Sequence, residues 1–460
     1  MNKIATIVGL TWKAAFRYRL FWILCALLAA AVVGLPLLIK DDGTAQGMVQ
    51  ILLTYTLSCT AALLGFATLW ISCGTLARDV EECQMQMVAV KPIARWQIWL
   101  GKWLGLLSLN AVLLALAGAS IFILLQWRAH RLSPDQQRVL REDIFVSRAS
   151  AREPPRDFSA EVERNMKLVV KDHPTLTDYD LSEIRKQITE RFKSHYTDLG
   201  PFRTMRPIDI DLHTLKDRLR DARLQLRIKF QTANANPETQ YTTMWRVGPP
   251  NSTRQVEFAE TFPADSFQEF TLPPNLLDDQ GHLWIEVGNP NEVNLTFPME
   301  EGIELLYPES TFGVNFIRGL VVVFCWLALL SSIGLASASF LSFPVAAFVS
   351  LAVLLIGLSS GTVATVVEQG TIVGYDASKG GYGHTVIDFV VVPIFQAVLK
   401  ILNLVQSFSP IDSLSSGRSI RWGQLGLAVV QIVVLLGGFF CVAGILLFTR
   451  RELATAQGNN

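Results

Sequence analysis

Long apolar runs dominate this sequence and restrict the folds that are open to it. A helix needs about 20 apolar residues to cross the hydrocarbon core of a bilayer, and six runs reach that length, at about 20–39, 51–76, 100–126, 314–337, 343–367 and 425–448. Their interiors hold almost no charged side chains, which are costly inside a membrane. We therefore predict an α-helical polytopic membrane protein with about six transmembrane helices, three in residues 20–126 and three in residues 313–452, in the cell inner (plasma) membrane.

Residues 1–19 precede the first apolar run and predict an amphipathic helix that lies in the membrane interface. Lys13 and Arg17 are four residues apart and share one helix face, while Trp12 and Phe16 supply apolar surface. The run that follows is too long for the apolar core of a signal peptide. The segment is basic and holds no acid, so we expect a cytoplasmic N-terminus.

A polar stretch, residues 127–312, separates the third run from the fourth. Three crossings precede it, so we expect it to be extracytoplasmic, with both termini and the tail 453–460 in the cytoplasm. Residues 133–223 are charged and predict helices, with breaks at Pro154 and Pro207. From 224 to 306 the pattern is β-rich, because apolar residues such as Leu224 and Leu226 alternate with polar ones. The insert is thus predicted to be an α+β domain that ends in a jelly-roll-like β-sandwich.

A further apolar segment, residues 386–405, is harder to assign. It is interrupted by Asp388, Pro393 and Lys400. If it crossed the membrane, the basic end of the last run would lie outside, against the usual charge distribution. We favour a re-entrant or interfacial outer segment, and a seventh span is the alternative.

The charged stretch 75–105 lies between the second and third runs and should leave the hydrocarbon. Its acids are Asp79, Glu81 and Glu82. They could be catalytic carboxylates, but a solvated helix face or an interaction surface is the simpler interpretation. The stretch continues with Pro92, which breaks helices, and then with Arg95, Gly101 and Lys102. The two basic residues could be anchors on the cytoplasmic side or contacts to a partner.

This order of an acidic patch, a Pro-x-x-Arg step and a Gly-Lys pair resembles the type-2 ABC transporter permeases, and most of all the copper-enzyme-maturation and gliding-type group. The resemblance covers residues 1–126 and about 312–452. It implies an N-terminal elbow helix and a cytoplasmic coupling loop, 75–105, that docks on a separate ABC ATPase subunit. It also implies dimerisation with itself or a sister permease. The ATPase-coupling residues would be Asp79, Glu81, Glu82, Pro92, Arg95, Gly101 and Lys102.

Other chemistry has no residues to support it. No G-x-x-x-x-G-K-[ST] occurs, so ATP hydrolysis is expected on a partner chain and the protein is not expected to be an enzyme. We expect no cofactor, no metal site and no nucleic acid. Gly357 and Gly361 form a G-x-x-x-G that favours helix packing. The sequence therefore predicts the permease subunit of an ATP-driven, exporter-type ABC transporter. The alternative is a non-transporting membrane anchor or sensor whose outer β-domain binds envelope glycan or protein.

Overall fold

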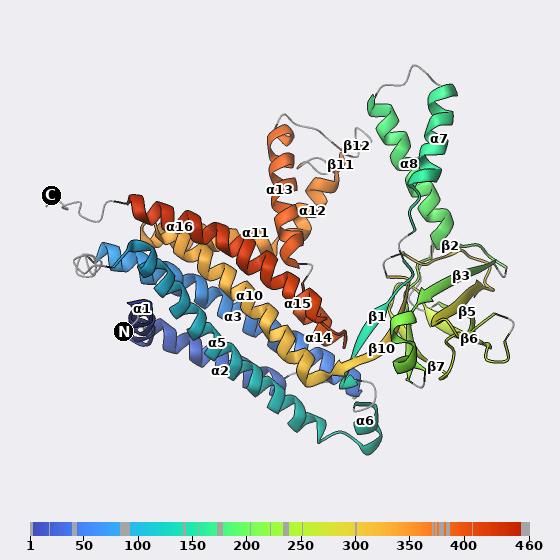
Figure 1. The fold of residues 1–460 in the computed structure, drawn as a ribbon, viewed down its shortest axis with the longest axis horizontal. Helices are drawn as coiled ribbons and strands as arrows, with labels where there is room; N and C mark the ends of the chain where they lie inside the picture. Colours follow the sequence, from blue (N-terminus) through green and yellow to red (C-terminus); the bar gives the residue numbers. More distant parts are fainter. Residues whose placement is uncertain are drawn as a thin grey trace. The chain divides into compact units, whose positions relative to one another are not determined.

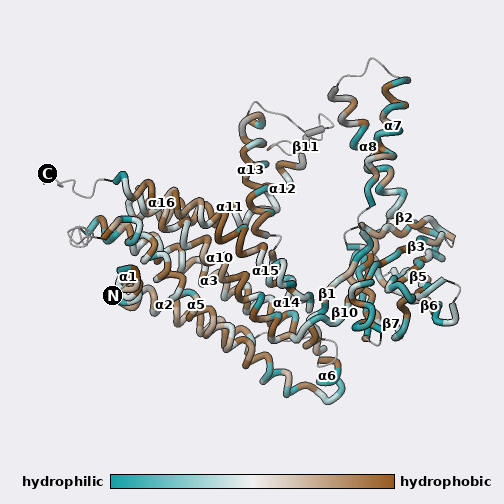
Figure 2. Tube along the Cα trace, in the orientation of Figure 1, coloured by the Kyte–Doolittle hydropathy of each residue, from teal (hydrophilic) through white to brown (hydrophobic). Residues whose placement is uncertain are grey.

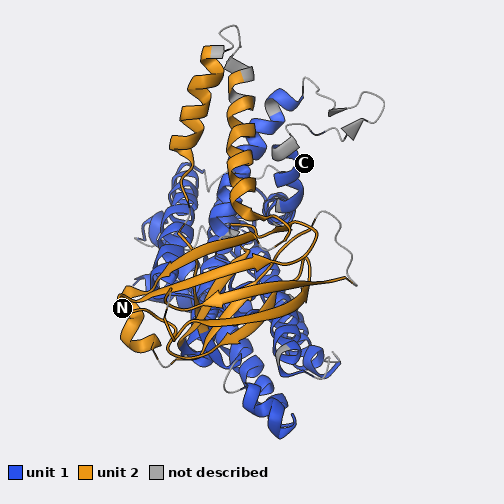
Figure 3. Cartoon of the chain, turned by 90° about the vertical axis from the view of Figure 1, so that its right-hand side faces the viewer, with its two compact units in different colours: residues 1–147, 310–460 blue, residues 148–309 orange. Residues whose placement is uncertain are grey.

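The computed structural model of the chain is mostly helical and separates into two compact units, 1–147 with 310–460, and 148–309 (Figures 1 and 3). It describes residues 3–17, 19–38, 44–82, 93–140, 144–154, 156–172, 178–202, 204–220, 222–232, 239–250, 252–299, 301–369, 372, 375–376, 381–382, 387–406 and 408–451. Each unit is considered by itself.

The first unit is built from long helices. Its N-terminal part consists of α1 (Lys3–Arg17), α2 (Arg19–Leu38), α3 (Ala45–Glu81), α5 (Arg95–Ala129) and α6 (Pro134–Val139). Its C-terminal part consists of α10 (Phe312–Ala338), α11 (Phe343–Leu358), α12 (Ser360–Gln369), β11 (Tyr375–Asp376), β12 (Gly381–Tyr382), α13 (Asp388–Gln406) and α14 (Pro410–Ser415). The last long helix joins α15 (Trp422–Ala428), a π-helical stretch, η3 (Val429–Gly437), and α16 (Gly438–Arg450).

In the described part of this unit, six helices are long and apolar enough to cross a membrane. Five coincide with predicted runs: Phe21–Leu38, Gly47–Glu81, Arg95–Ala129, Phe312–Ala338 and Trp422–Arg450. The sixth, Val391–Ser415, covers most of the segment whose assignment was left open. The predicted span over 343–367 corresponds to α11 and α12, which together are long and apolar enough but are bent by 67°, as in a broken span or a re-entrant loop. The bend falls at Ser359 and Ser360, just before Gly361, and sharp kinks are typical of such Ser and Gly pairs.

Small residues let the helices of this unit approach closely. A Cβ on Gly334 of α10 would lie 2.8 Å from Cβ of Ser72 of α3. On α5, a Cβ at Gly101 would lie 2.8 Å from Ile7, and one at Gly105 would lie 2.7 Å from Thr11, so α1 lies directly on α5. The trace of these helices is largely coloured hydrophobic (Figure 2), and many of their exposed side chains are apolar.

The second unit contains two four-stranded sheets in the described residues, with strand orders β1-β10-β4-β7 and β3-β8-β5-β6. The first sheet uses β1 (Val146–Ala151), β4 (Leu224–Ile228), β7 (Gln268–Leu272) and β10 (Ile303–Thr311). The second uses β3 (Thr204–Asp211), β5 (Gln240–Val247), β6 (Val256–Pro263) and β8 (His282–Asn289). A short pair joins β2 (Asp198–Leu199) to β9 (Leu295–Thr296). The helices are α7 (Ser159–Asp172), α8 (Asp178–Thr197), η2 (His213–Leu215) and α9 (Lys216–Leu219).

Both sheets contribute to one hydrophobic core. Alternate residues of β5, including Trp245 and Val247, are buried against residues of β4 such as Leu226. The apolar residues of the alternating pattern that predicted strands from residue 224 onward therefore form the inward face of the sheets. Trp245 is the largest side chain of this core, and its Nε1 donates to the hydroxyl of Thr243 at 2.8 Å.

The prediction of a helical half over 133–223 is wrong in part. α7 and α8 are helices that pack against each other, but β1, β2 and β3 also lie in this range. Pro207 was taken as a break and instead lies within β3, opposite Glu286 of β8. Proline has no amide hydrogen to donate to a neighbouring strand. It is tolerated here because β3 lies at the edge of its sheet.

Candidate functional site

The charged stretch 75–105 brings together several helix ends of the first unit. It includes the end of α3 and the beginning of α5, and the ends of α10 and α16 and the beginning of α11 contact it. Residues 83–92, with Cys83, Lys91 and Pro92, lie outside the described residues. The surrounding side chains show what this end of the unit is built to do.

Asp79 and Lys102 join α3 to α5. Lys102 is 7% exposed, and its Nζ donates to the carbonyl of Thr75 and to Oδ2 of Asp79, both at 2.6 Å. A buried ammonium needs such partners because its desolvation is costly. These two predicted residues are therefore brought together, and they face each other.

Glu81 joins α3 to α11. Its Oε1 accepts the backbone N–H of Phe343 at 2.8 Å, at the first residue of α11. Such an acid satisfies an otherwise unpaired amide and complements the positive end of the helix dipole. The guanidinium of Arg78 lies 4.3 Å from the centre of the Phe343 ring and strengthens the same contact.

Arg95 joins α5 to α16. Its Nη1 donates to the carbonyls of Phe448, Thr449 and Arg451, at 3.1, 2.8 and 2.8 Å. The last carbonyls of a helix have no partner within the helix, so Arg95 caps α16. The sequence could not reveal this contact, because the two segments are more than 350 residues apart.

Two further residues of this end were missed by the sequence interpretation. Arg451 donates through Nη1 to the carbonyls of Ala338 and Ser339, at 3.2 and 3.3 Å, and so joins α16 to α10. Trp99 is fully buried, and its Nε1 donates to Oγ of Ser339 at 3.2 Å. The basic pair at the end of the last run was a signal for Arg451, since cations commonly occupy helix C-termini.

The remaining predicted residues lie at the edge of this arrangement or away from it. Glu82 is exposed and ends α3, where its backbone N–H donates to Arg78 O at 2.8 Å. Gly101 contacts α1 and forms a close-packing G-x-x-x-G with Gly105, as described above. At Gly357 an added Cβ would meet only Leu402, at 3.8 Å, and at Gly361 it would meet nothing within 4 Å.

Among the described residues, then, the charged side chains mainly connect helices to one another. Asp79, Glu81, Arg95, Lys102 and Arg451 link α3, α5, α10, α11 and α16. We call these five residues the helix-end clamp. A displacement applied to residues 83–92 reaches α3 and α5 covalently and the other three helices through the clamp. No group of three metal-binding side chains occurs in the part of the chain that the structure describes.

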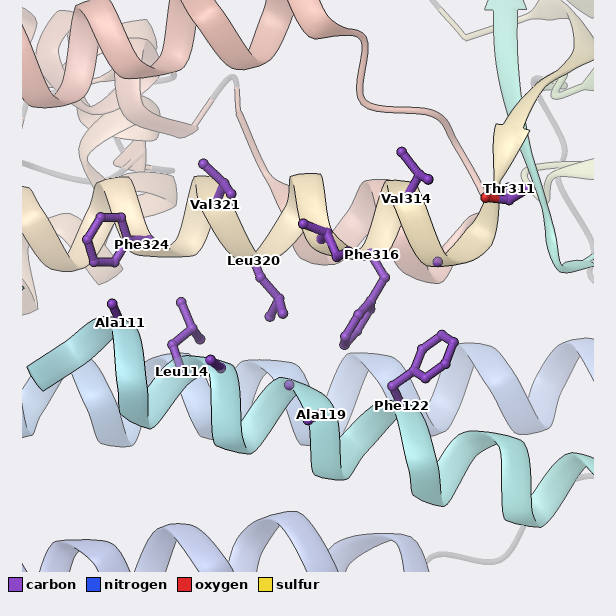
Figure 4. Close-up of a pocket in the computed structure, with 14 residues that line it drawn as sticks. Ala111, Leu114, Ala119, Phe122, Thr311, Val314, Phe316, Leu320, Val321 and Phe324 are labelled. Carbon is purple, nitrogen blue, oxygen red and sulfur yellow. The ribbon is translucent and has the colours of Figure 1, made fainter. Parts of the chain in front are cut away.

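One cavity of this unit lies between α5 and α10 and measures about 740 Å³ (Figure 4). Small residues of α5, among them Ala111, Ala115 and Ala119, line one side, and Phe316 and Phe324 of α10 line the other. Thr311 is the one hydroxyl residue among its lining residues. The described lining residues other than Thr311 are apolar, so the cavity suits apolar chains.

The chain has no match among protein-family models, and no curated protein and no solved structure shows a significant similarity to it.

Proposed function

We propose that this protein is the membrane-spanning permease subunit of an ATP-driven, exporter-type ABC transporter, and that it works with a separate ATPase subunit. The observation that carries the proposal is the helix-end clamp. It surrounds the charged loop that would contact the ATPase and fixes five helix ends to the base of that loop.

Insertion into a bilayer is part of the proposal. The six apolar helices and their exposed apolar side chains, such as Leu116 and Ile123 at 62% and 65% exposure, support it. We place both termini and residues 83–92 in the cytoplasm and residues 127–312 outside. The two strand orders of the outer domain support a jelly roll, which has eight strands in two sheets.

The proposed mechanism follows from the connections of the clamp. When the ATPase pair closes on ATP, it moves residues 83–92. Asp79 and Lys102 keep α3 and α5 together, so the loop moves both as one body. Arg95 passes the movement to α16, and Glu81 passes it to α11. Rigid helices that change tilt in this way open one side of a central seam, and a dimer of this chain or a sister permease supplies the two halves of that seam.

Docking and force transmission can be tested apart. Charge reversal at exposed Glu82 (Glu82→Lys) should lower the amount of ATPase that co-purifies with the permease, because like charges at a docked surface repel. Arg95→Gln should retain the ATPase but lose the connection to α16. An ATP analogue should then no longer change the reactivity of a cysteine placed at Ala119. Unchanged ATPase retention in Glu82→Lys, together with an unchanged ATP response in Arg95→Gln, would reject the coupling role.

Topology needs its own test. In a background without other cysteines, a cysteine at Ser252 should react with a membrane-impermeant thiol reagent in intact cells. Cys83 should react only after the membrane is opened. The opposite pattern would invert the proposed orientation. If no ATPase accompanies the purified protein, the alternative of an anchor or sensor with a ligand-binding outer domain becomes the better hypothesis.

A further inference from the structure

A buried cation without a described counterion lies near the beginning of α10. Arg318 is 6% exposed, and its Nη1 donates to the carbonyl of Ile420 at 3.0 Å. Its Nε is buried and has no hydrogen-bond partner among the described residues. No described carboxylate lies within ion-pair distance of this guanidinium.

The segment that faces Arg318 is held in place by α10 and is itself rich in donors. Asn315 donates through Nδ2 to Arg418 O and accepts the N–H of Ile420, both at 2.8 Å. The neighbouring hydroxyl of Ser419 is buried and finds no partner in the described part of the chain. Arg421 directly follows this segment and is the N-cap residue of α15.

The charges of this place favour an anion. A buried guanidinium without a counterion is costly, so a nearby negative charge would stabilise it. Arg318 brings the buried positive charge, and Arg418 and Arg421 lie on the segment that it contacts. The beginning of the long helix Trp422–Arg450 adds the positive end of its dipole. The acid that precedes Arg418 most closely in the sequence, Asp412, is exposed.

The hydrogen-bond donors at this place indicate which class of anion would bind. A guanidinium fork, a hydroxyl donor and a helix N-terminus are the groups that hold phosphate oxygens in proteins. Trp422 lies under Arg318, with its ring centre 4.4 Å from Cζ, and is 66% exposed. Tryptophan in such a position is typical of the boundary between headgroups and hydrocarbon. Both α10 and α15 begin here, and both belong to candidate membrane spans.

We propose that Arg318, Arg418, Arg421 and Ser419 form a binding site for the phosphate of an anionic phospholipid headgroup at the outer boundary of the membrane. The inference rests on the membrane insertion in the proposed function and not on ATPase coupling. The two proposals can therefore fail separately.

The test uses the full chain, purified in detergent with an equal mixture of phosphatidylglycerol and phosphatidylcholine, and native mass spectrometry of the retained lipid. The native protein should retain phosphatidylglycerol preferentially. Arg318→Gln should weaken this retention about tenfold, the effect expected when about 1.4 kcal/mol of a charge-assisted contact is lost. Arg318→Lys should recover part of it, because the charge returns without the fork.

Arg131→Gln is the matched control. Arg131 also stacks on a tryptophan, with Cζ 3.9 Å from the Trp127 ring centre, but it is exposed. This variant should keep the retention of the native protein. Ser419→Ala tests the site without a change of charge, in case Arg318→Gln does not fold, and it should weaken retention by a smaller factor.

Added inorganic phosphate separates the two sources of the ligand group. If free phosphate displaces the lipid only at concentrations far above those of the lipid, the headgroup is the ligand. If free phosphate binds with the same dependence on Arg318 and phosphatidylglycerol does not, the lipid assignment is wrong. Equal lipid retention in the native protein, Arg318→Gln and Ser419→Ala would overturn the site altogether.

Discussion

At the scale of single residues, the Asp79–Lys102 pair invites a direct measurement. Asp79→Asn removes the carboxylate from the ammonium of Lys102, a residue that is 7% exposed and that then keeps the Thr75 carbonyl as its described partner. We expect a loss of about 2–3 kcal/mol of stability. This is below the usual cost of breaking a fully buried pair, because the Asp79 side chain is 28% exposed.

Adding Lys102→Met to Asp79→Asn should recover much of that loss, since no buried charge then lacks a partner. Thermal unfolding of the four proteins of this cycle in detergent gives the coupling energy. Strictly additive effects of the two substitutions would show that the pair contributes nothing as a pair.

A second residue-scale prediction concerns pH and the turn before β8. A hydrogen bond to the carboxylate of Asp209 raises the pKa of His282 above its usual 6.5. Burial raises the pKa of Asp278, but the backbone N–H groups of His282 and Gln280 outweigh it and lower the pKa below 3.8. The stabilisation by His282 is therefore fully present below pH 6.5 and is lost as the pH rises through the raised pKa. That by Asp278 is present above pH 3.8 and is lost as the pH falls through the lowered pKa.

The melting temperature of unit 148–309 should consequently fall on both sides of mildly acidic pH. His282→Gln should flatten the decline on the alkaline side, and Asp278→Asn should flatten the decline on the acid side. Circular dichroism melts from pH 3 to pH 8.5 would check both. Parallel pH profiles for the native domain and the His282→Gln variant would refute the role of the histidine.

At the scale of elements, the space beside each glycine distinguishes helix faces that are packed from helix faces that are open. A Cβ at Gly101 would lie 2.8 Å from Cβ of Ile7, so Gly101→Ala must separate α1 from α5 and should cost about 1–3 kcal/mol. Gly9 in α1 has nothing within 4 Å, and Gly9→Ala should stabilise its helix by up to about 1 kcal/mol. Opposite shifts of the melting temperature in these two variants are the expected result. Destabilisation by both would contradict the α1–α5 contact.

The same scale shows what a sequence can and cannot predict. Five long helices were predictable because the requirement for about 20 apolar residues leaves little choice. The strand β4 was predictable because its alternation of period two, with Leu224 and Leu226 apolar, is a local property. The strand β3 was missed because Pro207 breaks helices and inner strands alike, and only the sheet order identifies β3 as an edge. The bend between α11 and α12 was missed although Ser359 and Ser360 mark it.

The candidate site illustrates a different limit. The sequence indicated which residues are charged but not which charges meet, since Arg95 and its acceptors are separated by most of the chain. The G-x-x-x-G of Gly357 and Gly361 was predicted to favour helix packing, but a Cβ added at Gly361 would meet nothing within 4 Å among the described residues. Gly101 and Gly105 instead lie close against α1. Contacts between residues that are distant in sequence can be identified only from the fold.

At the scale of the whole molecule, unit 148–309 has a core of its own, composed of residues from both sheets. Expressed alone, this segment should fold to a β-rich monomer with one cooperative thermal transition. Circular dichroism and melting would check it, with the Trp245→Ala variant as a control that should lose the transition or lower its midpoint strongly, because Trp245 is 1% exposed in the core. A featureless spectrum for the native segment would contradict the independence of the unit.

The neighbouring positions of β1 and β10 in one sheet also bear on how such a chain could have arisen. Just before β1 and just after β10, Phe145 and Phe312 stack with ring centres 5.2 Å apart, and Phe312 N donates to Phe145 O at 3.1 Å. The two points where the insert is spliced into the helical unit thus already touch. If residues 147–310 are replaced by a short turn, the remaining helices should still insert into a membrane. Conversely, the insertion of unit 148–309 into an ancestral helical protein requires only one recombination event and no rearrangement of its helices.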